Sequence, residues 1–371
     1  MKSQLNLSTS VEWHSPFEES IVALITNIDD DYITINGQKI YSNSKVNGII
    51  SNKTISKNNS ILHLRDSLDI FVGDILHLGP KRARVIFSVH SKTNSIFATV
   101  RCNSNCLMCS QPPLEHDDLD ENLAIWDTAI DYMPDKVEYI GVTGGEPTLL
   151  GSRLTLLLNK LTKKYPDINI DILSNGRRLS SSFKVELYQI QSPQSIKWCI
   201  PIYSDVDYVH DYIVQGDNAF WQTTRGLSQV YSTGFQTEIR IVLHSLSLDR
   251  LEQLAKYITL NYPYVHHVAL MGLENIGYTL YHNKLLTIEN YDVYIYKVSK
   301  AITILRNFNL NVSLYNIPLC HVPEELRKYC RQSISEWKNS YPPDCQSCSL
   351  KKDCAGFFTW NLKLNPIVYP I

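Results

Sequence analysis

Residues 101–110 read Arg-Cys-Asn-Ser-Asn-Cys-Leu-Met-Cys-Ser and place Cys102, Cys106 and Cys109 in a C-x3-C-x2-C spacing. Three thiolates in one short loop are the ligand type that soft metals and iron–sulfur clusters prefer. A cuboidal four-iron cluster needs one ligand for each iron, so three cysteines leave one iron without a protein ligand. The stretch therefore predicts a metal centre at which an open iron can bind a substrate or cofactor.

The cysteine loop lies between a predicted strand and a predicted helix. Residues 95–100 have the β-branched and aromatic bias of a strand, and residues 117–133 have apolar side chains every three or four positions after an acidic start. The cysteines are therefore expected on a strand-to-helix loop. A structural zinc site, completed by a fourth ligand such as His116, is the alternative for the same thiols.

Composition limits the classes of function that suit this chain. The 371 residues include 44% hydrophobic residues and carry a formal charge of −2, with lysine and arginine dispersed, so no basic stripe argues for nucleic acid. No apolar run approaches the roughly 18 residues that span a bilayer, and the N-terminus lacks a signal-peptide layout. We therefore expect a cytoplasmic protein that binds neither membrane nor nucleic acid.

The nine cysteines are grouped rather than scattered. Eight fall near Cys102 or from Cys320 onward, and in a reducing compartment such grouping favours metal binding over disulfides. Cys199 stands alone in an apolar run, and we expect it to be an inert core residue.

The hydrophobic pattern predicts an α/β protein with three parts. Residues 1–92 carry short β-like runs between turn signals and predict a β-rich domain. Residues 93–310 alternate strands with helices and predict a partial (β/α)6 barrel, in which chemistry gathers at the C-terminal ends of the strands. Residues 311–371 predict a small cysteine-rich domain. The expected barrel strands are residues 95–100, 137–142, 168–173, 196–203, 237–243 and 265–271.

A second motif follows the second predicted barrel strand. It reads Gly-Val-Thr-Gly-Gly-Glu-Pro over residues 141–147. Gly144 and Gly145 permit a close approach of the backbone to a ligand, Glu146 supplies a carboxylate, and Pro147 favours the start of a helix. An ordinary strand-to-helix turn is the alternative.

Two further predicted strands provide polar side chains that are candidates for ligand binding. The third strand ends in Leu-Ser-Asn-Gly, so Ser174 and Asn175 either face a ligand or form an Asn-Gly turn. Arg240 on the fifth strand is suited to binding a carboxylate in a bidentate manner. An ion pair with Glu238 is the alternative for Arg240.

The C-terminal region contains a second group of thiols in which the last three have a C-x2-C-x5-C spacing. The run 312–319 resembles a strand and would hold Cys320 on a rigid element, whereas Cys330 falls in a segment that resembles a short helix with proline at its start. We therefore expect Cys330 to be spare, although it stays a possible ligand. A zinc site is the alternative to an iron–sulfur cluster. The expected ligands are Cys320, Cys345, Cys348 and Cys354.

The cysteine spacing and the Gly-Gly-Glu-Pro motif resemble those of the radical S-adenosylmethionine (SAM) superfamily. The resemblance implies a 4Fe-4S cluster on Cys102, Cys106 and Cys109, with the open iron chelated by the amino and carboxylate groups of SAM. It also implies that the Gly-Gly-Glu segment holds the methionine ammonium group, that Arg240 pairs with the SAM carboxylate, and that Met108, at a usually aromatic position, packs near the adenine. The residues that the resemblance places at the cofactor are Met108, Gly144, Gly145, Glu146, Ser174, Asn175 and Arg240.

A narrower resemblance covers the chain from about residue 90 to its end. The string Thr-Val-Arg-Cys-Asn-Ser-Asn-Cys-Leu-Met-Cys-Ser-Gln-Pro-Pro over residues 99–113, with Pro318-Leu-Cys320 and the last cysteines, looks like the C-type member of the paired His-Xaa-Ser system radical SAM maturases. This implies a 5'-deoxyadenosyl radical that modifies a His-Xaa-Ser repeat peptide. It also implies an auxiliary 4Fe-4S cluster, a partner radical SAM enzyme and an electron donor such as a flavodoxin or ferredoxin.

Two other functions stay open at this point. A radical SAM enzyme could act on a small molecule or on RNA, although the near-neutral charge weighs against RNA. A zinc-stabilised peptide-binding module without catalysis is the alternative from a different class.

Overall fold

The computed structural model describes residues 13–14, 20–28, 32–36, 38–41, 49–50, 61–62, 68–78, 83–332, 339–359 and 368–371. The chain divides into two compact units. The first comprises Met1–Phe97, Leu119–Gly141 and Lys160–Ile168, and the second comprises Ala98–Asp118, Val142–Asn159 and Asn169–Ile371. The domain limits expected at residues 92 and 310 remain predictions.

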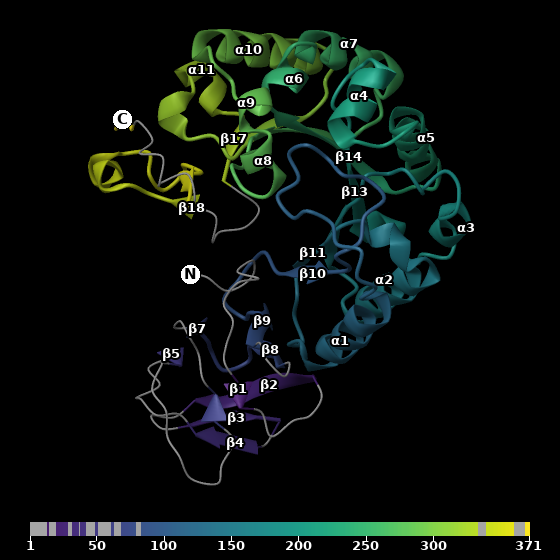
Figure 1. Ribbon diagram of the computed structural model, residues 1–371, viewed down its shortest axis with the longest axis vertical. Helices are drawn as coiled ribbons and strands as arrows, with labels where there is room; N and C mark the ends of the chain where they lie inside the picture. The colour runs from purple at the N-terminus through teal and green to yellow at the C-terminus, as the bar shows by residue number, and fades with distance from the viewer. Residues whose placement is uncertain are drawn as a thin grey trace. The chain divides into compact units, whose positions relative to one another are not determined.

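The first unit contains a mainly antiparallel sheet, drawn in purple and blue in Figure 1. Alternate residues of its long strand β2, such as Ala23 and Ile25, are fully buried, as expected of a strand with one face on a core. The N-terminal β-rich region predicted from the sequence is thereby confirmed. In the described residues the strand order is β1-β6-β4-β3-β2-β8-β9. The strands are β1 Trp13–His14, β2 Ile21–Ile28, β3 Tyr32–Ile35, β4 Gln38–Tyr41, β6 Ile61–Leu62, β8 Ile75–Leu78 and β9 Ala83–Phe87, and a separate pair is formed by β5 Ile49–Ile50 and β7 Leu68–Asp69.

The larger sheet has the strand order β10-β11-β12-β13-β14-β15-β16-β17 among the described residues. From β12 to β17 every neighbouring pair is parallel, which confirms the predicted α/β class. The strands are β10 Ser95–Phe97, β11 Tyr139–Thr143, β12 Asn169–Leu173, β13 Ile196–Pro201, β14 Gln236–Leu243, β15 His267–Gly272, β16 Val312–Tyr315 and β17 Cys330–Arg331.

Alternation along these strands separates an apolar set of side chains from a polar one. Trp198 on β13 is fully buried, with ring centroids 6.1 Å from Phe183 and 6.2 Å from Phe235. Cys199, the next residue in β13, is buried as predicted, but it lies among the charged side chains Lys197, Glu238 and Arg240. The polar set carries charged side chains from β12 to β15, including the ion pair between Lys197 and Asp171 at 3.2 Å.

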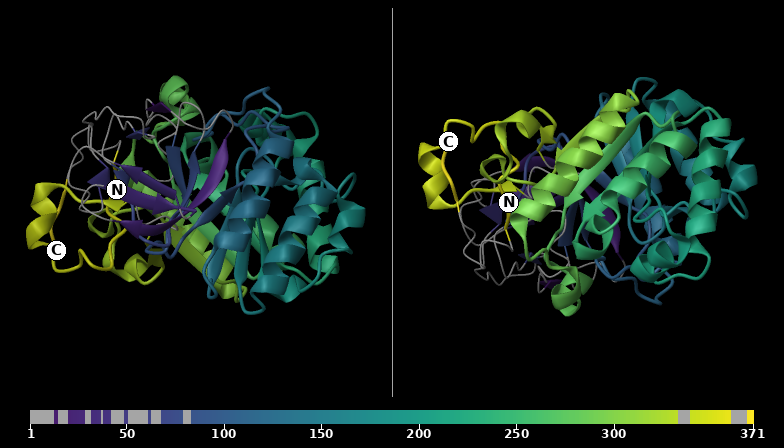
Figure 2. Two further views of the ribbon diagram at one scale, coloured as in Figure 1. Left: turned by 90° about the horizontal axis from the view of Figure 1, so that it is seen from below. Right: turned by 90° about the horizontal axis from the view of Figure 1, so that it is seen from above.

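Helices connect the strands, and Figures 1 and 2 show α5, α7 and α10 lying outside the strands of the second unit. The side chain of Asn290 caps α10 by accepting a 3.0 Å hydrogen bond from the backbone N–H of Val293. No helix in the described part of the chain is both long and apolar enough to cross a membrane. The helices are α1 Leu119–Tyr132, α2 Ser152–Lys164, α3 Lys184–Leu187, α4 Asp207–Val214, α5 Ala219–Ser232, α6 Ser245–Leu248, α7 Leu251–Asn261, α8 Tyr278–Tyr281, α9 Asn283–Leu286, α10 Tyr291–Asn307 and α11 Glu324–Arg327.

The sheet continues beyond the six predicted strands. The strand expected over residues 312–319 ends at Tyr315, and Cys320 lies in the 3-10 turn Leu319–His321. The expectation that Cys330 lies in a helix is wrong, because α11 ends at Arg327 and Cys330 pairs with Leu314 of β16. Pairing with a neighbouring strand overrides the local helical pattern here.

Candidate functional site

The cysteine loop follows β10 and is held in place by its own backbone. The N–H of Cys109 donates a 3.0 Å hydrogen bond to the carbonyl of Cys106, which forms a turn between the last two thiols. The N–H of Leu107 donates to the carbonyl of Ile213 at the end of α4, also at 3.0 Å. The loop therefore has a defined shape and a fixed attachment to the second unit.

The three thiols are largely shielded from water. Burial raises the pKa of Cys102 to about 12, and it also raises the pKa values of Cys106 and Cys109. Thiols in this environment stay protonated until a metal cation displaces the protons. Metal loading of this loop is therefore expected to release protons.

The three thiols of the cysteine loop are the donor type of an iron–sulfur cluster and also that of a zinc site. Among the described residues, no group of three or more His, Cys, Asp or Glu side chains is arranged to hold a metal ion. Tetrahedral zinc, with Zn–S bonds of about 2.3 Å, needs its thiolates about 3.8 Å apart. A cuboidal cluster spaces its ligands more widely, because each thiolate binds a different iron.

Gly144 and Gly145 pack directly against the backbone that leads into the cysteine loop. Gly144 has a φ of +134°, and a Cβ there would lie 2.6 Å from the carbonyl oxygen of Thr99. A Cβ on Gly145 would lie 2.0 Å from the carbonyl oxygen of Arg101, and the N–H of Gly145 donates to Thr99 at 2.7 Å. Glycine is required at both positions because any side chain would collide with protein backbone.

Glu146 is fully buried, and both of its carboxylate oxygens are bound by protein donors. Oε1 accepts hydrogen bonds from the N–H and hydroxyl of Thr148, at 3.0 and 2.6 Å, and from the hydroxyl of Ser174 at 2.7 Å. Oε2 accepts a 2.7 Å hydrogen bond from the N–H of Asn175. The carboxylate therefore joins the Gly-Gly-Glu segment to the loop that follows β12.

Asn175 extends this connection to the cysteine loop. Its side-chain amide donates to Oδ1 of Asn103 at 2.6 Å and contacts the sulfur of Cys102 at 3.8 Å. The Asn-Gly turn expected at this position also exists, since Oδ1 of Asn175 accepts a 3.0 Å hydrogen bond from the N–H of Arg177. Turn formation and contact with the site are thus combined in one residue.

Arg177 is a residue of the site that sequence reasoning missed. Its guanidinium donates to the carbonyl of Asn103 and, at 3.1 Å, to the hydroxyl of Ser104. The only signal in the sequence was its position two residues after Asn175. A single arginine in a loop indicates no partner until the tertiary structure brings the two loops together.

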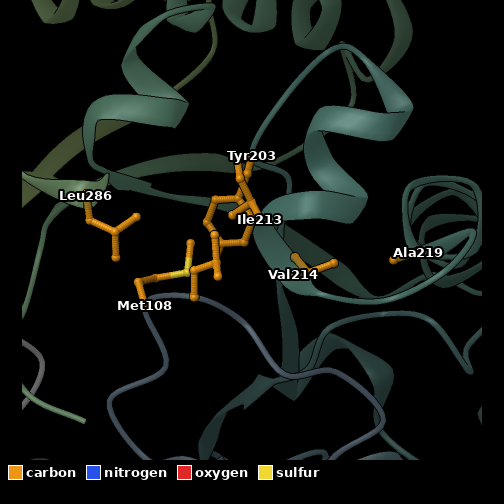
Figure 3. Close-up of a cluster of buried hydrophobic side chains, with 7 residues drawn as sticks. Met108, Tyr203, Ile213, Val214, Ala219 and Leu286 are labelled. Atoms are coloured by element: carbon orange, nitrogen blue, oxygen red, sulfur yellow. The ribbon is translucent and has the colours of Figure 1, made fainter. Parts of the chain in front are cut away.

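Met108 lies in a buried apolar cluster rather than at the surface of the loop. Figure 3 shows its side chain beside those of Tyr203, Ile213 and Leu286. The ring of Tyr203 stacks on His210, with centroids 5.9 Å apart. Met108 therefore anchors the cysteine loop to the core of the second unit.

Arg240 forms the ion pair that was the alternative reading of its sequence context. Its Nε lies 2.6 Å from Oε1 of Glu238, while Oε2 of Glu238 lies 2.8 Å from Nδ1 of His267 and 3.5 Å from Nζ of Lys197. Burial by itself would raise the pKa of Glu238, but Arg240, His267 and Lys197 together hold it well below its usual range. Arg240 thus belongs to a buried charge network between β13, β14 and β15.

Four C-terminal cysteines line one pocket. The sulfur of Cys354 accepts hydrogen bonds from the backbone N–H groups of Leu319 and Gly356, both at 3.3 Å. Cys330 is not among the lining residues, and its thiol points towards the carbonyl of Leu326 at 3.9 Å. The cysteines that line the pocket are Cys320, Cys345, Cys348 and Cys354.

Comparisons with solved structures show partial likenesses at low sequence identity. SuiB of Streptococcus suis bound to S-adenosylmethionine shares 15% identity with a TM-score of 0.48, over 62% of this chain and 51% of SuiB. SuiB bound to the precursor peptide SuiA shares 15% identity with a TM-score of 0.46, over 62% of this chain and 49% of SuiB. Native anSMEcpe with bound AdoMet shares 16% identity with a TM-score of 0.45, over 60% of this chain and 63% of anSMEcpe. The chain spans about half the length of the SuiB chains.

The sequence itself matches a family model. No protein of curated function matches the chain. Residues 96–258, which include the cysteine loop and the Gly-Gly-Glu and Ser-Asn-Gly segments, match the model of the radical SAM superfamily. This chain therefore contains a radical SAM superfamily domain over residues 96–258.

Proposed function

We propose that this protein is a radical SAM enzyme that cleaves SAM reductively and uses the 5'-deoxyadenosyl radical to modify a peptide, specifically a His-Xaa-Ser repeat peptide. One observation carries the proposal. The cysteine loop, the Gly-Gly-Glu segment and the Ser-Asn-Gly segment form one hydrogen-bonded assembly around Glu146 and Asn175. These three segments have the sequences expected to hold a cluster and SAM.

The cysteine loop would hold the catalytic cluster. Cys102, Cys106 and Cys109 would bind a 4Fe-4S cluster and leave one iron open to the amino and carboxylate groups of SAM. When bound, this cluster supplies the electron that breaks the sulfonium C–S bond. The loop contributes a largely buried setting, which keeps water away from a reactive radical.

The remaining residues would orient SAM. The carboxylate of Glu146 is already used by protein donors, so we assign the amino end of SAM to the backbone of Gly144, Gly145 and Glu146. Glu238 binds Nε of Arg240, and we assign the SAM carboxylate to the terminal amino groups of this guanidinium. Met108, Ser174 and Asn175 would complete the SAM site by fixing the surrounding loops.

The C-terminal pocket would hold an auxiliary 4Fe-4S cluster on Cys320, Cys345, Cys348 and Cys354. The two N–H groups directed at the sulfur of Cys354 hold that sulfur in place at the pocket wall, as hydrogen bonds around a ligating atom do. This cluster would accept the electron left after hydrogen abstraction or anchor the peptide. We further propose a cytoplasmic location, a partner radical SAM enzyme, and a flavodoxin or ferredoxin as electron donor.

Anaerobic reconstitution tests the proposed function. The protein should take up iron and sulfide, turn brown, and release 5'-deoxyadenosine from SAM when reduced with dithionite. A colourless protein that binds zinc and leaves SAM intact would contradict it. With a synthetic His-Xaa-Ser repeat peptide, a SAM-dependent mass change is expected, whereas SAM cleavage without any peptide product would favour a small molecule or RNA.

A further inference from the structure

Arg177 connects the cysteine loop with the segment that begins α5. On the cysteine loop, its Nη1 donates to the carbonyl of Asn103 and to the hydroxyl of Ser104, the latter at 3.1 Å. On the other side, its Nε donates to Oε1 of Gln222 at 2.6 Å and its Nη2 donates to the carbonyl of Asp217 at 3.1 Å. One planar guanidinium therefore uses all three of its nitrogens to hold two segments together.

The position of these contacts within the loop is important. Asn103 and Ser104 lie between the first two cysteines, Cys102 and Cys106, so anchoring them restricts how those two thiols can move apart. Gly216 leaves the room that the guanidinium occupies, since a Cβ there would lie 2.6 Å from Nη1.

The charge of Arg177 also acts on the thiols. Its Nη1 binds the carbonyl of Asn103, the residue that follows Cys102, and the hydroxyl of Ser104, so the positive charge lies against the cysteine loop. The guanidinium stays protonated at every physiological pH. A fixed cation beside a cluster stabilises its reduced, more negative state and thereby makes the reduction potential less negative.

We propose that Arg177 is a positioning residue that holds the cysteine loop in its ligand-binding shape and makes the reduction potential of the bound cluster less negative. The effect on the reduction potential rests on the proposed function, because it requires a cluster on Cys102, Cys106 and Cys109. The positioning of the cysteine loop concerns the chain alone and applies to the metal-free protein. Arg177 acts through the loop and its charge, not by contact with substrate.

Two variants of Arg177 and one control distinguish its effect on the shape of the cysteine loop from the effect of its charge. Arg177→Gln removes the charge and most of the N–H donors, while Arg177→Lys keeps the charge but loses the planar arrangement of donors. Arg178→Gln is the matched control, because Arg178 donates only to the nearby Ser182 among the hydrogen bonds of the described residues, at 2.8 Å. Amide hydrogen exchange of residues 103–107 is measured in metal-free protein, and the midpoint potential is measured after reconstitution by redox titration followed by electron paramagnetic resonance.

The expected results differ between the variants. In both Arg177 variants, exchange of the loop amides accelerates about tenfold or more, as the loss of two or three hydrogen bonds implies. The midpoint potential becomes more negative in Arg177→Gln and stays near the wild-type value in Arg177→Lys. Arg178→Gln changes neither quantity.

Different outcomes would overturn the positioning role and the effect of the charge on the reduction potential. Unchanged loop exchange in both Arg177 variants, or acceleration spread equally over the helices of the second unit, would overturn the local positioning role. Equal potentials in Arg177→Gln and wild type would overturn the role of the charge. Failure of the wild-type protein to bind iron would instead contradict the proposed function, and the exchange result would still decide the positioning role.

Discussion

The backbone N–H of Asn175 donates a 2.7 Å hydrogen bond to Oε2 of Glu146, and the side-chain amide of the same asparagine lies 3.8 Å from the sulfur of Cys102. Asn175 thus connects the carboxylate of one loop to a thiol of another. Glu146 is fully buried, and its carboxylate accepts hydrogen bonds from Thr148, Ser174 and Asn175, as a buried polar group requires. Replacing Glu146, Asn175 or Cys102 should therefore shift the positions of the other two side chains.

Cys106→Ala should prevent the cysteine loop from binding its cluster while the fold is retained, because the residue lies in a loop and not in the sheet. Iron content should fall to the amount held by the C-terminal site, and 5'-deoxyadenosine release should be abolished. Leu156→Ala is the control, since this exposed residue of α2 should be replaceable with almost no change in unfolding free energy and with full activity. Normal SAM cleavage by Cys106→Ala would refute the assignment.

Glu146→Gln should lower the free energy of unfolding of the metal-free protein by about 1–3 kcal/mol, because an amide N–H₂ would face donors that now bind a carboxylate. Urea denaturation followed by circular dichroism measures this change. Glu138→Gln is the matched control, because Glu138 is exposed and pairs with Lys136 at 2.5 Å, so its replacement should leave the unfolding free energy almost unchanged. Equal stability of the two variants would show that Glu146 does not anchor the loops.

His210 should make the protein less stable in mild acid. Burial lowers the pKa of His210 to about 3, and its Nδ1 accepts a 3.2 Å hydrogen bond from the N–H of Tyr203. The unfolded chain binds a proton near pH 6.5 and the folded chain does not, so stability falls as the pH drops from about 6.5 towards 3. At pH 5 this effect of His210 lowers the unfolding free energy by about 2 kcal/mol relative to neutral pH.

His210→Asn tests this pH dependence, because the asparagine oxygen can accept the same N–H but cannot take up a proton. The difference in unfolding free energy between pH 7 and pH 5 should shrink by about 2 kcal/mol in this variant. An unaltered pH dependence in His210→Asn would mean that His210 is protonated in the folded state.

Cys320→Ser should lose the iron of the C-terminal site, whereas Cys330→Ser should keep it. Cys320 lines the pocket with the last three cysteines, while Cys330 lies in β17 beside Leu326. Iron and sulfide are counted in each variant after the three cysteines of the first loop have also been replaced. Loss of iron in Cys330→Ser but not in Cys320→Ser would make Cys330 the ligand and Cys320 the spare cysteine. Zinc in place of iron in both variants would indicate a structural zinc site.

Much of the fold was predictable because it depends on local periodicity. Strands buried against helices have continuous apolar runs bounded by turn residues, so the six predicted barrel strands agree with β10 to β15 within three residues at each end. β16 falls within the run 312–319 that resembles a strand, whereas β17 has two residues, pairs with β16 and was not predicted. A two-residue strand has no period of its own to detect.

The sequence by itself determined the chemistry of the site, since the spacing of Cys102, Cys106 and Cys109 and the Gly-Gly-Glu motif are properties of contiguous residues. Only the tertiary structure decided the partners of Glu146, Asn175 and Arg177. Their hydrogen bonds join loops that lie far apart along the chain and meet at neighbouring strand ends. A short motif specifies which groups are available, whereas the packing of strands and helices specifies which of them come within hydrogen-bonding distance.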